Sequence, residues 1–257
     1  MRTLSMEVAG HSRRARIVGQ GEDLLLFFHG SRQSGAVARR FSAGTFEWPG
    51  WTVAYLDGVG HHFNDLRRCL DERTRREGVD DVAFARAVVE QLHPQRVWAC
   101  GYSNGGHMVL RLLIDAPGLL TGAAVLAATQ PTPDNLLPHS LDGYVPTPVL
   151  FMNGTADAIS PYGGGVAGLD ATSGRGTGLS APETARLWAR RNGCLGAPEE
   201  LRYAPDVSVL RWPSVELWSL EGCGHVIPTG QPAPPMLGAT TDSVVAAEVI
   251  AQFFARR

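Results

Sequence analysis

The sequence predicts an α/β architecture in which helices flank a mostly parallel sheet of eight strands. Short apolar runs alternate along the chain with stretches of helical periodicity, which is the pattern of layered α/β proteins. Most of these runs are almost continuously apolar, as expected for strands that are buried on both faces of a parallel sheet. The chain has 257 residues, 44% of them hydrophobic and 19% charged. We therefore expect a single globular domain spanning residues 1–257.

The expected strands follow in chain order. Two polar stretches with alternating hydrophobicity predict an antiparallel hairpin at residues 3–8 and 12–18. Six apolar runs predict the strands of the parallel part, at residues 24–28, 52–56, 96–100, 123–128, 148–152 and 215–220.

Helical patterns lie between these strands. Residues 80–92 place apolar side chains on one stripe, with Asp80 or Asp81 as the N-cap. A second helix is expected over residues 104–116 and a terminal one over 241–257. A helix over 180–193 begins with Ser180 and Glu183 in capping-box spacing. The glycine-rich stretches at 162–178 and 230–238 are expected to be surface loops.

Charge and cysteine content exclude several classes of protein. The formal net charge is −2, which gives no reason to expect a nucleic acid or a membrane as partner. Arginines cluster locally, and we interpret these clusters as solvated surface; they are Arg13, Arg14 and Arg16, then Arg67 and Arg68, then Arg73, Arg75 and Arg76. The N-terminus lacks the apolar segment of a signal peptide, so a cytoplasmic location and free thiols are expected for the four scattered cysteines, although one disulfide stays open. The oligomeric state cannot be predicted.

The strongest functional motif is Gly101-Tyr102-Ser103-Asn104-Gly105. It matches the pattern G-x-S-x-G, and it stands directly after an expected strand and directly before an expected helix. In such a turn the serine hydroxyl is exposed at the end of the strand, and the two glycines allow strand and helix to pass closely. Ser103 is therefore predicted to be a nucleophile. The Asn104 N–H, at the start of the helix, is predicted to face a developing oxyanion.

A serine nucleophile needs a base and an acid that orients the base. Asp157 follows the strand at 148–152, and His225 follows the strand at 215–220. The carboxyl ends of parallel strands meet at one edge of the sheet, so Ser103, Asp157 and His225 are expected to lie together. Three other aspartates compete for the acid's role, but none follows a strand so closely; they are Asp134, Asp142 and Asp170.

Two further readings concern the loops at this edge. Cys223 and His225 could be half of a metal site, but no additional ligands stand at matching spacing, so no metal is predicted. The strand at 24–28 ends in His29-Gly30, and the backbone N–H of Ser31 or of Arg32 could be the second oxyanion donor. Which of the two donates is left open.

With these motifs in place, the chain resembles the α/β-hydrolase superfamily. More narrowly it resembles the polyhydroxybutyrate depolymerases and feruloyl esterases among the carboxylesterases. The resemblance extends from about residue 5 to the C-terminus. It rests on the segments HGS, DGVGHHFNDLR, GYSNGG, NGTADAISPYGGG, LSAPETARLWARRNGC and GCGHVIP in their order and spacing.

The resemblance implies a serine esterase that has the triad Ser103, Asp157 and His225 and needs no cofactor. The segment at 63–65 lies near the active site in that family. We therefore expect the substrate cleft to involve Tyr102, His62 and Asn64, together with the loops at 160–178 and 226–238.

Three departures from the family pattern stand out. Cys223 replaces a usual glycine, and Val226-Ile227 stands where an aromatic residue is common; both are expected to reshape the cleft. Arg32 replaces a small residue and is expected to overhang the pocket, where it could favour acyl groups that carry a carboxylate. The partner that usually bridges Cys194 is missing, so no disulfide is expected there.

The sequence thus predicts a carboxylesterase that acts on a small-molecule or oligomeric ester through an acyl-enzyme on Ser103. A peptidase or amidase of the same fold and a non-catalytic ligand-binding protein are the alternatives. Fold and triad do not define the acyl or alcohol part of the substrate.

Overall fold

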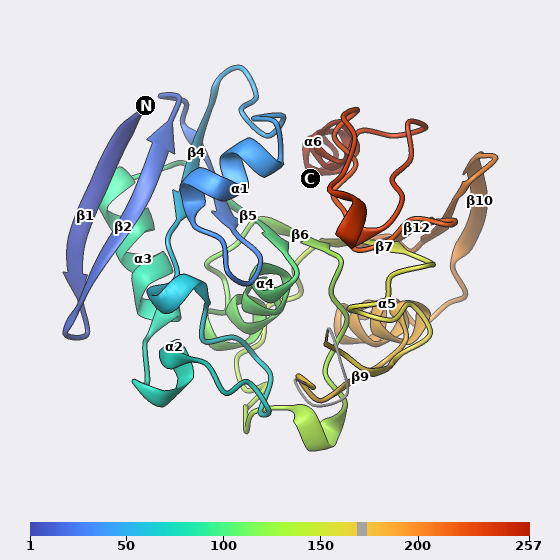
Figure 1. Ribbon diagram of the computed structural model, residues 1–257, viewed down its shortest axis with the longest axis horizontal. Coiled ribbons are helices and arrows are strands. Elements are labelled where there is room, and N and C mark those ends of the chain that lie inside the picture. The colour runs from blue at the N-terminus through green and yellow to red at the C-terminus, as the bar shows by residue number, and fades with distance from the viewer. Residues whose placement is uncertain (169–173) are drawn as a thin grey trace.

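Ten strands form one continuous sheet in the computed structural model, which describes residues 1–168 and 174–257 (Figure 1). The strand order across the sheet is β1-β2-β4-β3-β5-β6-β7-β12-β11-β10. The strands are β1 (Arg2–Val8), β2 (His11–Val18), β3 (Asp23–Phe28), β4 (Trp51–Leu56), β5 (Arg96–Tyr102), β6 (Gly122–Leu126), β7 (Val149–Gly154), β10 (Glu199–Ala204), β11 (Val207–Arg211) and β12 (Val215–Leu220).

The centre of the sheet is parallel and its two edges are antiparallel. Strands β4, β3, β5, β6, β7 and β12 lie in this order and pair in parallel with one another. The hairpin β1–β2 joins β4 in antiparallel fashion at one edge, and β11 and β10 extend the sheet beyond β12 at the other. The parallel strands all run in the same direction, so their carboxyl ends lie on one side of the sheet. The loops that follow β3, β5, β7 and β12 therefore converge on that side.

All eight expected strands are present, but the expected number of strands was too small. The missing pair is the hairpin β10–β11, and a short two-stranded pairing, β8 (Gly165–Val166) with β9 (Thr177–Gly178), lies outside the main sheet. Strand β10 is largely exposed, so it carries no continuous apolar run to identify it. Its alternation of Leu201 with polar neighbours was the available signal.

Helices cover both faces of the sheet. Residues of α1 (Gly35–Phe41) and α6 (Ala246–Ala255) pack in one hydrophobic cluster, and residues of α3 (Asp81–Leu92), α4 (Asn104–Asp115) and α5 (Ala181–Arg191) pack in the cluster on the other face (Figure 1). A short helix, α2 (Arg73–Arg76), precedes α3. Within the described residues, no helix is long and apolar enough to cross a bilayer.

The helix caps follow the sequence patterns closely. The Asp80 side chain accepts a hydrogen bond from the Ala83 N–H, so Asp80 is the cap of α3. Ser180 and Glu183 form the expected capping box of α5. Helix α6 is shorter than expected, because Thr241 and Ser243 donate hydrogen bonds to the carboxylate of Asp206 and stay outside the helix.

Two arginines that were expected at the surface are buried. Arg13 is only 1% exposed and pairs with the fully buried Asp81 at 2.5 Å, while Arg67 is 4% exposed. Arg14 and Arg68 are exposed, as expected. Arginine is buried where a carboxylate compensates its charge, and the sequence clusters gave no indication of those partners.

Candidate active site

Ser103 occupies a strained turn between β5 and α4. Its backbone has φ 55° and ψ −116°, a conformation that non-glycine residues rarely adopt. A Cβ on Gly101 would lie 2.1 Å from the Gly105 carbonyl oxygen, and a Cβ on Gly105 would lie 2.1 Å from the Phe28 carbonyl oxygen. Only glycine fits at both positions: Gly101 lets β5 approach α4, and Gly105 lets α4 approach the end of β3.

Asp157 and His225 meet at the ends of neighbouring strands. Asp157 follows β7, His225 follows β12, and His225 Nδ1 lies 2.7 Å from Asp157 Oδ2. The other carboxylate oxygen of Asp157 accepts the backbone N–H groups of Ile159 and Ser160, each at 2.8 Å. Both side chains are buried. The carboxylate is therefore fixed in orientation by its own loop and leaves one oxygen for the imidazole.

Ser103 and His225 line one cavity of about 310 Å³ at this edge of the sheet. Among the described residues, no hydrogen bond joins Ser103 Oγ to the imidazole ring. Such bonds are commonly long in ligand-free hydrolases and tighten when substrate binds. The predicted serine and histidine thus face a shared space, and the aspartate lies behind the histidine.

The loop after β3 presents one free backbone donor. The Arg32 N–H donates to the His61 carbonyl at 2.9 Å, and the Gly30 N–H donates to Gln33 Oε1 at 3.1 Å. The Ser31 N–H, between them, has no partner among the described residues, and Ser31 lines the cavity. Of the two predicted alternatives, the Arg32 N–H is therefore already occupied.

Two features concern the loop after β3 and the turn at Ser103, called the elbow below. The His29 ring accepts the Gly58 N–H at Nε2, 3.0 Å away, and its Nδ1 lies 2.7 Å from the Gly30 carbonyl. Burial lowers the pKa of His29 to about 4, so the ring is neutral and can accept at Nε2 while donating at Nδ1. At the elbow, the Asn104 N–H belongs to the first turn of α4, where backbone donors have no partner within the helix.

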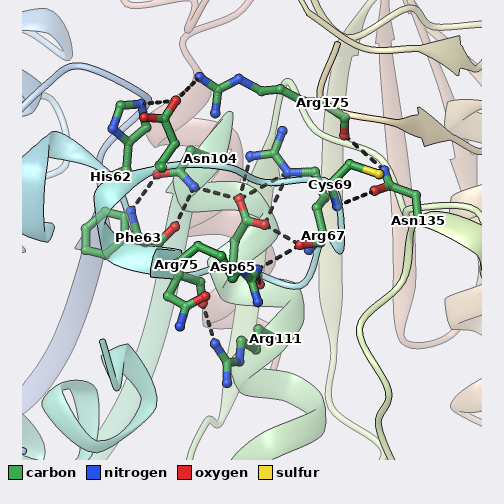
Figure 2. Close-up of polar contacts among 12 residues, drawn as sticks. His62, Phe63, Asp65, Arg67, Cys69, Arg75, Asn104, Arg111, Asn135 and Arg175 are labelled. Atoms are coloured by element: carbon green, nitrogen blue, oxygen red, sulfur yellow. Dashed lines mark hydrogen bonds and ion pairs between the residues drawn. The ribbon is translucent and has the colours of Figure 1, made fainter. Parts of the chain in front are cut away.

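The side chain of Asn104 attaches the elbow to residues 63–65. It accepts the Phe63 N–H at 2.8 Å and donates to the Phe63 carbonyl at 3.0 Å and to Asp65 Oδ2 at 2.6 Å (Figure 2). Asp65 is fully buried, and both of its carboxylate oxygens accept hydrogen bonds from the Arg67 side chain. Burial would raise the pKa of Asp65, but the charge and hydrogen bonds of Arg67 outweigh it and lower that pKa to about 2.

The predicted substrate-binding residues separate into two groups. Tyr102 lines the cavity, and its hydroxyl donates to the His225 carbonyl at 2.6 Å, so it also supports the loop that follows β12 and carries His225, called the base loop below. His62 and Asn64 are buried and are not among the residues that line the cavity. Asn64 donates to the Val79 carbonyl, and His62 Nε2 lies 3.4 Å from Glu72 Oε1. Both residues therefore contact protein groups behind the cavity wall and do not face a substrate.

Among the polar residues of the cavity wall, Arg67 and His107 were not predicted from the sequence, whereas Arg175 belongs to the loop at 160–178 that was expected to form the cleft. His107 follows Ser103 by one helical turn, and this spacing was the available signal, because residues at i and i+4 share a helix face. Burial and the charge of Arg67 lower the pKa of His107 to about 3, so this imidazole is neutral. Arg32 lines the same cavity, as expected.

The departures in the base loop do not reach the cavity. Cys223, Val226 and Ile227 are buried in the hydrophobic cluster that includes α6, rather than in the cavity lining. Burial raises the pKa of the Cys223 thiol to about 11, so it stays protonated and fills space. All four cysteines are free thiols.

The rival acids and the metal alternative gain no support. Asp134 and Asp142 are exposed, and Asp170 lies outside the described residues. Within the part of the chain that the structure describes, no group of three or more His, Cys, Asp and Glu side chains is arranged to hold a metal ion.

The sheet order and the serine turn after β5 define the class: the protein has the α/β-hydrolase fold. The acetyl xylan esterase from Aspergillus awamori superposes over the whole length of both chains with a TM-score of 0.69 at 12% sequence identity. The expected fold is thereby confirmed.

Relatives in sequence are named as esterases. NocK of Nocardia uniformis subsp. tsuyamanensis, which carries an esterase name, is 33% identical over an alignment of 173 residues, and the match covers 61% of this chain and 48% of NocK. Feruloyl esterase B of Piromyces equi is 30% identical over an alignment of 167 residues, and the match covers 59% of this chain and 28% of that protein. The chain thus spans less than half of the length of either relative. No protein-family model matches it. The expected resemblance to carboxylesterases, feruloyl esterases among them, is confirmed.

Proposed function

We propose that the protein is a serine carboxylesterase that hydrolyses a small-molecule or oligomeric ester through an acyl-enzyme on Ser103. The observation that carries the proposal is the 2.7 Å contact between Asp157 and His225 in a loop pair that faces the strained Ser103 turn across one cavity. The esterase names of the relatives support the same reaction.

The first half-reaction forms the acyl-enzyme. Asp157 keeps the proton of His225 on Nδ1, so Nε2 is free to take the proton of the Ser103 hydroxyl as Oγ attacks the acyl carbon. The N–H groups of Ser31 and Asn104 stabilise the oxyanion, and one such donor typically contributes about 3 kcal/mol. His225 then protonates the departing alkoxide as the ester C–O bond breaks.

The second half-reaction regenerates the serine. His225 takes a proton from water, the resulting hydroxide attacks the acyl carbon, and the carboxylic acid leaves as Ser103 Oγ regains its proton. Neither half-reaction needs a cofactor. The location in the cytoplasm, the single-domain organisation and the absence of nucleic-acid and membrane partners remain predictions from the sequence.

The test is hydrolysis of p-nitrophenyl acetate by two variants, each of which replaces one serine of the cavity wall. Ser103→Ala should reduce turnover to background, whereas Ser160→Ala, which alters another serine of the cavity wall, should keep measurable Ser103-dependent activity. Equal turnover by Ser103→Ala and the wild type would show that Ser103 is not the nucleophile.

Matched ester and amide substrates test the alternative activity. The esterase proposal predicts a far higher kcat/KM for the ester. Preference for the amide would identify a peptidase or amidase, and binding of both without turnover would identify a ligand-binding protein.

A further inference from the structure

The cavity wall has an unusual charge composition. The described residues that line it include three arginines, Arg32, Arg67 and Arg175, and no aspartate or glutamate. The chain as a whole has a net charge of −2, so this cationic surface is a local feature and does not reflect the average composition. In a partly enclosed space, charges of one sign raise the local concentration of ligands of the opposite sign.

Arg67 is rigidly held. Its Nε and Nη2 bind the carboxylate of Asp65, and the carbonyl oxygens of residues 65 and 67 both accept hydrogen bonds from Arg75 Nη2 at 2.7 Å (Figure 2). A guanidinium has five N–H donors, and a carboxylate that binds Nε and Nη2 leaves donors free. Arg67 Nη1 makes no hydrogen bond to any described residue, while the side chain lines the cavity.

Arg175 reaches the same wall from a different part of the chain. Its Nη2 donates to Glu72 Oε1 at 2.8 Å (Figure 2), whereas Nη1 is buried and has no partner among the described residues. Burial and the nearby charge of Arg67 lower the pKa of Arg175. The buried Nδ1 of His107, in the same wall, also lacks a described partner. Buried polar atoms without partners are rare in native proteins, and a ligand is one explanation for them.

Arg67, which is buried, and Arg175, which is partly buried, each pair with a carboxylate. Asp65 and Glu72 are both absent from the cavity lining, so they compensate the guanidiniums from outside the cavity. Arg32 is exposed at the rim and forms no salt bridge within the described residues. A substrate therefore meets guanidinium donors and no carboxylate.

We infer that the cavity selects esters that carry a carboxylate, bound by Arg67 and Arg175 while Ser103 attacks the ester carbonyl. A half-ester of a short dicarboxylic acid is the simplest substrate of this class. The inference rests on the proposed esterase function, because it names the substrate class of that same site. Arg32 guides the anion toward the cavity from the rim.

The test compares two p-nitrophenyl esters of nearly equal size, the hemiglutarate and the valerate. The wild type should have a kcat/KM at least tenfold higher for the hemiglutarate. Arg175→Met should reduce this preference by about tenfold to a hundredfold, the range for losing a hydrogen bond to a charged group. The matched control is Arg68→Met, an exposed arginine outside the cavity, which should leave the ratio unchanged.

The outcomes separate the inference from the esterase proposal. If the wild type hydrolyses the valerate as well as the hemiglutarate in a Ser103-dependent manner, or if Arg175→Met keeps the wild-type ratio, the carboxylate preference is refuted and the esterase proposal stands. If neither ester is hydrolysed, the esterase proposal fails. Calorimetry with the Ser103→Ala protein then tests the anion site alone.

In that calorimetric experiment the hemiglutarate should bind more tightly than the valerate. The difference should shrink as salt is added, because ions screen the attraction, and it should be lost when Arg175→Met is combined with Ser103→Ala. Equal binding of the two esters would overturn the inference without any assay of turnover.

Discussion

Replacement of Asp157 by asparagine tests how the loop after β7, which carries Asp157, positions His225. Asp157 Oδ1 accepts two backbone N–H groups, from Ile159 and Ser160, and only Oδ2 contacts His225 Nδ1. An asparagine oxygen can satisfy both backbone donors, so its amide NH₂ will face the imidazole. The ring then must accept at Nδ1 and carry its proton on Nε2, where it cannot receive the proton of Ser103.

The expected loss follows from this change of tautomer. In Ser-His-Asp triads the substitution of the acid by asparagine lowers kcat by about 10⁴-fold, equivalent to about 5.5 kcal/mol of transition-state stabilisation. The stability of the fold should change little, because the two backbone hydrogen bonds of the loop are retained.

The assay is kcat for p-nitrophenyl acetate at pH 7, with thermal unfolding measured on the same samples. Asp142→Asn is the matched control, since Asp142 is an exposed rival acid, and it should keep the wild-type rate. A fall of less than tenfold for Asp157→Asn, or an equal fall for Asp142→Asn, would refute the assigned role.

Three further predictions concern stability. Asp81→Asn removes the counter-charge of a buried arginine and should lower the free energy of unfolding by about 3–5 kcal/mol in urea titrations, whereas the adjacent Asp80→Asn should change it little because asparagine caps a helix equally well. Equal losses would contradict the pairing. Gly105→Ala should cost about 3 kcal/mol through its clash with backbone, while Gly196→Ala, where a Cβ meets open space, should stay within about 0.5 kcal/mol; a stable Gly105→Ala protein would refute the close approach. The pKa of His107 lies near 3, below the ordinary 6.5. Its contribution to the free energy of unfolding is therefore complete above pH 6.5 and is lost as the pH falls, by up to about 1.4 kcal/mol per pH unit. The free energy of unfolding of His107→Gln should fall less steeply than that of the wild type as the pH is lowered from 6.5 to 4.5. An unchanged slope would argue against the neutral buried ring.

The sequence predicted the central part of the fold well, because buried parallel strands consist of continuous apolar runs. The six runs from 24–28 to 215–220 all form strands of the parallel core. The hairpin β10–β11 was missed because an exposed edge pair needs no such run. The start of α6 was misplaced, since the hydrogen bonds that Thr241 and Ser243 donate to Asp206 depend on the tertiary fold.

The candidate site was predictable where chemistry is tied to strand ends. Ser103, Asp157 and His225 each follow a strand, and parallel topology brings strand ends together. The roles of Arg67 and Arg175 could not be predicted, because their counter-ions and their position in the cavity wall arise from loop packing. An arginine within a local cluster is usually solvated, and only the three-dimensional contacts reveal which one is buried.

The most direct test of the central claim is covalent labelling by a fluorophosphonate, followed by intact mass and peptide mapping. The proposed mechanism predicts one adduct on Ser103 in the wild type and in Ser160→Ala, and none in Ser103→Ala. Labelling of Ser103→Ala to the same extent as the wild type, or an adduct mapped to another residue of the cavity, would contradict it.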